Sequence, residues 1–191
     1  MDSFIDSLQN DPEKSIFIDE GRMSLYLGVD ISRLPDDDGC KLTQSFLIQR
    51  FVQAVNFDTT TTKGLRDNVP AGYPLLSKYA NGPPKKAPWK YRSVGDMLGY
   101  LQGTSRPDKS FAVHQCVRFN KNPRLSHERA IKRIVRYFLD TKDQGLIYKP
   151  DKSNGLECYV DADFAGGWKD GDHGSPESVL SQTGFVIMFA G

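Results

Sequence analysis

The sequence lacks the features that mark membrane proteins, secreted proteins and several common enzyme classes. No apolar run approaches the roughly 18 residues that a membrane span needs, and the acidic start lacks the basic and then apolar order of a signal peptide. The three cysteines lie far apart without a CxxC pair, which argues against a zinc knuckle and a disulfide framework. No P-loop, G-x-G-x-x-G, G-x-S-x-G or H-E-x-x-H motif is present. We expect an intracellular protein, cytoplasmic or nuclear, with no membrane partner.

What the sequence does have is an uneven distribution of charge. The formal net charge is only +1. Residues 1–40 contain ten acids and three bases, residues 41–149 seven acids and twenty bases, and residues 150–191 seven acids and two bases. A basic centre between acidic ends predicts a surface for a polyanion in the middle and a cation site near the C-terminus. Charge scattered over a solvated face is the alternative.

Hydrophobic periodicity predicts a mixed α+β chain. Up to residue 57 the expected elements are, in order, a helix at 2–9, a strand at 15–18, a strand at 25–32, a turn at 35–39, a returning strand at 41–43 and a helix at 44–55. Residues 58–90 carry five prolines and few periodic apolar positions, which predicts an extended linker. At its end, Trp89 and Tyr91 are expected to anchor the linker to the next helix; stacking on bases is the alternative.

Three helices are predicted after the linker. Ser93 is expected to cap the first helix and Asp108 the second, while Ser126 is expected to cap a third helix over 127–139. Serine and aspartate suit these positions because their side-chain oxygens accept hydrogen bonds from the free N–H groups of a first helical turn.

The C-terminal part changes to the period of a β-strand. Gly145 ends the helical pattern, and 146–148 begins the strand-like character. Residues 156–164 and 183–189 then predict the two strands of a hairpin. Because a two-stranded hairpin is marginal in isolation, we expect the sequence to be cut off inside a domain.

The third predicted helix carries an apolar stripe and a basic stripe. The apolar stripe consists of Ala130, Ile131, Ile134, Val135 and Phe138. The basic stripe, at i, i+3, i+4 and i+7, consists of Arg129, Lys132, Arg133 and Arg136. Four cations over roughly 10 Å suit a row of backbone phosphates, because neutralising phosphates releases counterions. Arg118 and Lys121 enlarge this predicted nucleic-acid-binding surface; an ordinary solvated helix face is the alternative.

Two aspartates share one face of the first hairpin strand. Asp161 and Asp163 alternate with apolar residues, so their carboxylates point the same way, about 7 Å apart. Mg²⁺ prefers such oxygen ligands together with substrate phosphate, so this pair could begin the site of a two-metal nuclease. Two acids cannot complete such a site, and we expect no catalysis by this chain alone. An edge strand with acidic residues for solubility is the alternative.

Several short motifs occur in an order and spacing that are specific together. They are SLYLGVDIS at 24–32, LTQSFLIQRFVQAVNF at 42–57, YRSVG at 91–95, SRPD at 105–108, AIKRIVRY at 130–137, GLIY at 145–148, YVDADFAG at 159–166 and SQTGF at 181–185. With these motifs the chain resembles the reverse transcriptase–RNase H part of Ty1/copia-type retrotransposon polyproteins. The resemblance extends over nearly the whole length.

The resemblance implies an α+β fold in which a helical thumb/connection region precedes the first β-hairpin of a truncated RNase H-like domain. The implied parts are the end of a reverse transcriptase palm with a thumb-like segment at 1–57, an extended linker at 58–90, a helical connection region at 91–149 and a truncated RNase H-like start at 150–191. The insertion at 169–180 is longer than the tight hairpin turn usual in the family.

The resemblance also implies a function. Asp161 corresponds to the first catalytic acid and metal ligand of the RNase H site, and Asp163 is a further candidate. The other RNase H acids and the polymerase aspartates are expected outside this sequence. The parent would polymerise DNA on RNA and cleave RNA in RNA–DNA hybrids with Mg²⁺, in a virus-like particle. This chain would keep contact with an RNA–DNA hybrid or DNA duplex, and the missing polymerase and RNase H portions would be its partners. A non-catalytic nucleic-acid-binding module is the alternative.

Overall fold

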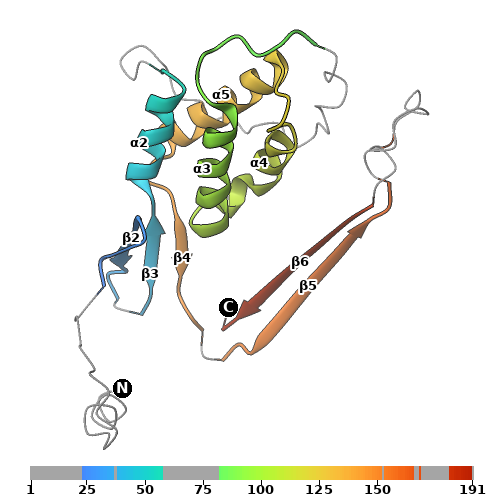
Figure 1. Cartoon of the computed structure of the whole chain (residues 1–191). Coiled ribbons are helices and arrows are strands. Elements are labelled where there is room, and N and C mark those ends of the chain that lie inside the picture. Colours follow the sequence, from blue (N-terminus) through green and yellow to red (C-terminus); the bar gives the residue numbers. More distant parts are fainter. Residues whose placement is uncertain are drawn as a thin grey trace, which may run out of the picture.

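The computed structural model describes residues 23–36, 38–57, 82–151, 153–165, 168 and 181–190. Within these ranges the chain forms a group of helices, a four-stranded sheet beside them and a separate two-stranded hairpin (Figure 1). This mixture confirms the α+β class. The helix expected at 2–9 and the strand expected at 15–18 lie outside the described residues.

The four-stranded sheet is antiparallel throughout, in the order β1-β2-β3-β4. Its strands are β1 (Leu25–Tyr26), β2 (Val29–Arg33), β3 (Cys40–Thr43) and β4 (Leu146–Tyr148). The single strand expected at 25–32 is wrong, because Leu27 and Gly28 form a two-residue turn with φ of 49° and 79°. Two consecutive residues with positive φ match the twist of a tight hairpin, but leucine is an uncommon residue there.

The pairing of β3 with β4 joins segments about a hundred residues apart. Leu42 lies opposite Leu146, and the Lys41 ammonium donates a hydrogen bond of 2.7 Å to the carbonyl oxygen of Asp143. A Cβ atom on Gly145 would overlap the carbonyl oxygen of Leu42. Glycine therefore permits the close approach with which the sheet closes beside the last helix.

The helices enclose one hydrophobic core. They are α2 (Ser45–Ala54), α3 (Tyr91–Thr104), the 3-10 turn η2 (Pro107–Lys109), α4 (Ser110–Val117) and α5 (Leu125–Asp140). The completely buried apolar side chains include Phe51, Leu98, Leu101, Ile131, Val135 and Phe138. The rings of Phe51 and Phe138 lie 5.9 Å apart, so α2 shares its core with the helices that follow the predicted linker. The expected helix at 44–55 is confirmed.

The three predicted helix caps are wrong. Ser93 and Ser126 lie inside α3 and α5, which begin two and one residues before them. The α5 helix begins earlier because the buried His127 ring accepts a hydrogen bond of 3.0 Å from the backbone N–H of Arg124. The Asp108 carboxylate does not cap α4, because it binds the guanidinium of Arg106 instead.

The hairpin consists of β5 (Leu156–Asp163) and β6 (Gln182–Phe189), which pair along their whole length. Both predicted strands are confirmed. Paired residues share a face of an antiparallel sheet, so one face combines the exposed apolar side chains Leu156, Val160, Phe185, Ile187 and Phe189. In the part of the chain that the structure describes, none of the helices has the length and apolar character to cross a membrane.

Candidate nucleic-acid interface

The basic residues of α5 lie opposite its buried face. Ile131, Ile134, Val135 and Phe138 are buried, as the apolar stripe predicts. The four cations Arg129, Lys132, Arg133 and Arg136, called the basic face below, together line a shallow open depression of about 370 Å³. Arg129 and Arg133 are exposed, and Lys132 and Arg136 are half-buried. The structure thus brings these four predicted residues together on one surface.

Lys132 forms an ion pair beneath this surface. Its ammonium lies 2.8 Å from Oε1 of Glu128, one turn earlier in α5. Glu128 is only 4% exposed. Its other oxygen, Oε2, accepts hydrogen bonds of 3.0 and 3.1 Å from the backbone N–H groups of Lys86 and Ala87. Burial opposes the charged carboxylate, but these three hydrogen bonds outweigh it and lower the pKa of Glu128.

Residues 83–90, called the lysine segment below, cross the start of α5. The carbonyl oxygen of Pro83 accepts a hydrogen bond of 2.9 Å from the backbone N–H of Leu125. The next residue, Pro84, forms a β-bridge with Arg124. This contact places Lys85 and Lys86 near Glu128. Burial lowers the pKa of Lys85, and Lys132 adds to this effect while Glu128 opposes it. Sequence reasoning assigned these lysines to the linker, because nothing local in the sequence shows that Glu128 binds the backbone N–H groups of Lys86 and Ala87.

Two aromatic residues fix the end of the lysine segment. Trp89 and Tyr91 are buried, and their rings stack 5.7 Å apart. The Lys85 ammonium lies 4.4 Å from the centre of the Trp89 ring, and the Tyr91 hydroxyl donates a hydrogen bond of 2.9 Å to the carbonyl oxygen of Cys116. The expectation that these rings anchor the segment is confirmed, and their burial leaves them unavailable for stacking on bases.

The two flanking cations lie elsewhere. Arg118 donates a hydrogen bond of 3.1 Å to the side chain of Gln115, and its guanidinium lies 5.9 Å from the centre of the Phe119 ring. Lys121 is exposed in the turn between α4 and α5. Neither residue lines the depression of the basic face.

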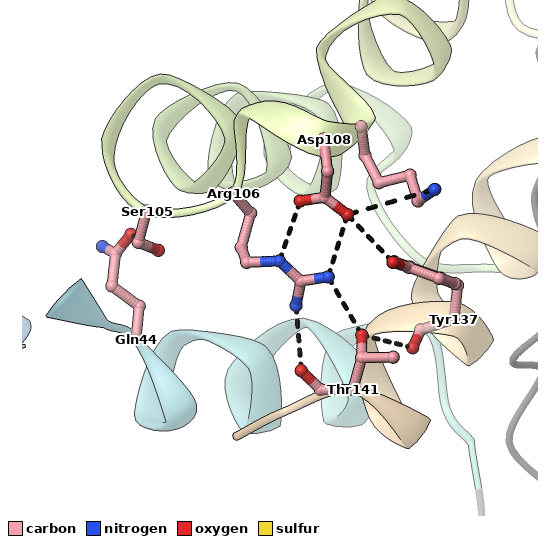
Figure 2. A network of polar contacts seen from close by, with 7 residues as sticks. Gln44, Ser105, Arg106, Asp108, Tyr137 and Thr141 are labelled. Atoms are coloured by element: carbon pink, nitrogen blue, oxygen red, sulfur yellow. Dashed lines mark hydrogen bonds and ion pairs between the residues drawn. The ribbon is translucent and has the colours of Figure 1, made fainter. Parts of the chain in front are cut away.

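A buried arginine fixes the other end of α5 (Figure 2). The guanidinium of Arg106, which is 2% exposed, forms a fork with the Asp108 carboxylate through hydrogen bonds of 2.9 and 3.1 Å. It also donates to the carbonyl oxygen of Thr141 at 2.9 Å and to its hydroxyl at 3.1 Å. The Tyr137 hydroxyl donates to Asp108 at 2.9 Å. Burial opposes the charge on Asp108, but these donors and the nearby Lys109 together lower its pKa.

A second buried pair lies beside this network. The Ser105 hydroxyl donates a hydrogen bond of 2.9 Å to Oε1 of Gln44, and both side chains are buried. Figure 2 shows that Gln44 comes from the start of α2, while Ser105 directly precedes Arg106. The start of α2, the end of α3 and the last turn of α5 are therefore joined by polar contacts. These contacts hold the helix that carries the basic face.

The two predicted acidic residues lie on β5. Asp161 pairs with Gly184 and Asp163 with Gln182, so both aspartates occupy the same face of the hairpin, and both are exposed. Within the described ranges, no three histidine, cysteine or acidic residues lie close enough together to hold a metal ion. The carboxylates of Asp161 and Asp163 are ligands of the kind that Mg²⁺ takes, but two carboxylates on one strand do not form a complete site. Their catalytic role stays a prediction.

Comparison with known proteins identifies the family. The chain is 32% identical over 181 residues to the Retrovirus-related Pol polyprotein from transposon RE1 of Arabidopsis thaliana, which covers 95% of this chain and 11% of that protein. It is 31% identical over 195 residues to the polyprotein from transposon TNT 1-94 of Nicotiana tabacum, and this alignment covers 98% of this chain and 14% of that protein. The chain belongs to the retrotransposon Pol family.

The relationship extends to a yeast element. The Putative transposon Ty5-1 protein YCL074W of Saccharomyces cerevisiae is 26% identical over 174 residues, which are 91% of this chain and 52% of that protein. The chain spans 10% to 14% of the length of the plant Pol polyproteins that it matches. No family model matches the chain, and no solved structure matches it.

Proposed function

We propose that this Pol segment belongs to a retroelement reverse transcriptase/RNase H and contacts an RNA–DNA hybrid or DNA duplex through the basic face of α5. The observation that carries the proposal is the convergence of Arg129, Lys132, Arg133 and Arg136 on one open depression. In this proposal the helix would belong to the thumb/connection region of the parent, as the resemblance to the family implies. The parent's polymerase and RNase H activities are part of the same proposal.

Electrostatics explains why such a surface would bind a duplex without reading its sequence. Each phosphate that a cation neutralises releases condensed counterions, so log K falls linearly with log salt, with a slope of about −0.9 per contacted phosphate. Arg129 and Arg133 are exposed, and arginine presents a planar set of donors that matches phosphate oxygens. Contacts of this kind position a duplex but do not specify its bases.

The hairpin carries the second part of the proposal. Asp161 would be an acid of an RNase H-like site, with Asp163 as a further candidate. Mg²⁺ held there would activate water and stabilise the leaving oxygen when the site is complete. Among the residues that the structure describes, no three potential metal ligands come together, and we derive no catalytic step for this chain. A nucleic-acid-binding module without catalysis is the alternative.

Fluorescence anisotropy with a labelled RNA–DNA hybrid at several salt concentrations tests the binding proposal. We expect R129A/R133A to weaken binding and to reduce the salt slope by about two, one for each phosphate that the variant no longer neutralises. The matched control is R50A/R92A, which removes two exposed arginines from α2 and α3. If R129A/R133A and the unsubstituted chain bind with the same affinity and the same salt slope, the proposal is refuted.

A further inference from the structure

We infer that Glu128 is a positioning residue that holds Lys86 beside the basic face, so that two elements of the chain form one phosphate-binding surface. The inference rests on the proposed function for its ligand, the backbone of a nucleic-acid duplex. It concerns the lysine segment, which is distant in sequence from α5 and contributes the exposed Lys86, a cation that periodicity did not reveal. The Lys85 ammonium is already bound within the segment, by the carbonyl oxygen of Ala87 and the Trp89 ring.

The geometry makes Glu128 the centre of this arrangement. Its two carboxylate oxygens accept three hydrogen bonds, two from the lysine segment and one from Lys132. The backbone of Lys85 is also bonded to the chain just before α5, through a hydrogen bond of 3.4 Å from its N–H to the carbonyl oxygen of Pro123. The peptide groups of Lys86 and Ala87 are thus held directly beside the first turns of α5, next to the ion pair.

Simple electrostatics predicts the opposite role for this residue. A carboxylate in a basic surface repels phosphate, and its removal would also release Lys132 from an ion pair. Both effects would tighten binding. Here, however, the carboxylate is buried and its hydrogen-bonding capacity is used by donors of the protein. If it holds the lysine segment, its removal releases Lys86 from the surface and weakens binding. The two roles therefore differ in the sign of the effect.

Two substitutions of Glu128 separate charge from positioning. E128A removes the charge and the acceptors, and we expect binding to the labelled hybrid to weaken several-fold, with a salt slope reduced by up to about one. E128Q removes the charge but keeps an oxygen that can accept the N–H groups of Lys86 and Ala87, so we expect binding at least as tight as that of the unsubstituted chain. Tighter or unchanged binding by E128A, or equal weakening by both variants, would overturn the inference.

A second measurement follows the lysine segment without nucleic acid. Trypsin cleaves after lysine, and the Ala87 N–H at the scissile bond after Lys86 is bound to Glu128. We expect cleavage at this bond to be faster in E128A and nearly unchanged in E128Q, with circular dichroism confirming that the helices are intact. Equal cleavage rates in E128A and the unsubstituted chain would contradict the positioning role.

The K86A variant tests the positioned lysine directly. We expect it to weaken binding as E128A does, and we expect E128A to cause no further weakening in this background. Unchanged binding by K86A overturns the inference even where E128A fails to fold. Weakening by R129A/R133A without any effect of K86A would leave the proposed function intact, whereas no effect of R129A/R133A would refute the proposed function itself.

Discussion

Replacement of Arg106 by methionine removes a buried charge while keeping an unbranched apolar side chain of comparable reach. The guanidinium makes two hydrogen bonds to Asp108 and two to Thr141. It also lies 4.8 Å from the centre of the Phe138 ring. Removing one partner of a buried ion pair costs roughly 3–5 kcal/mol. Because the Asp108 side chain is 41% exposed and regains water, we expect the free energy of unfolding to fall by about 3 kcal/mol, the lower end of that range.

Urea denaturation followed by circular dichroism measures this loss. The matched control is R92M, because Arg92 and Asp96 form an exposed pair 3.9 Å apart, and exposed pairs contribute about 0–1 kcal/mol. D108N tests the partner, and the R106M/D108N double variant should lose less than the sum of the single variants because the two residues interact directly. An effect of R106M no larger than that of R92M would refute the view that this network holds the helices together.

Three further predictions concern stability. F51A removes a completely buried ring and should cost roughly 3–5 kcal/mol in urea denaturation; a loss below about 1 kcal/mol would mean that the core is not closed at this point. G145A should lower the thermal unfolding midpoint because its Cβ would overlap Leu42, whereas exposed G103A should not lower it. The folded state lowers the pKa values of Glu128 and Asp108, so their stabilisation is complete above the unfolded carboxyl pKa of about 4 and is lost as pH falls through the lower folded values. Urea midpoints that stay unchanged as the pH falls below about 4 would contradict this stabilisation by Glu128 and Asp108.

Local patterns predict those elements of this fold whose amphipathicity is strong. The helix at 44–55 and the stripes of α5 follow from spacing alone, because a helix buries the side chains that recur at intervals of three and four residues. The first strand of the hairpin follows from alternation over eight residues. In each case the side chains that decide the structure are neighbours in the sequence.

The features that sequence patterns failed to predict depend on contacts between residues outside a local window. His127 replaces the expected serine cap by binding the backbone of Arg124. The turn at Leu27 and Gly28 lacks the Asn-Gly or Asp-Gly signal of a tight hairpin. It is stabilised by the surrounding sheet, whose other strands lie outside any local stretch of sequence. The contribution of Glu128 depends on a partner about forty residues away, so no spacing rule could find it.

The two parts of the proposed function depend on different structural supports. The basic face stands on α5, whose opposite side is buried in the helical core and whose C-terminal turn is held by Arg106. Of the residues that the structure describes in β5 and β6, none belongs to that core, and Asp161 lies on the exposed hairpin. Substitutions in the helical core should therefore abolish duplex binding, while substitutions of the hairpin aspartates should leave it intact. Contact with a duplex can be established or refuted for this chain whatever the catalytic role of its aspartates proves to be.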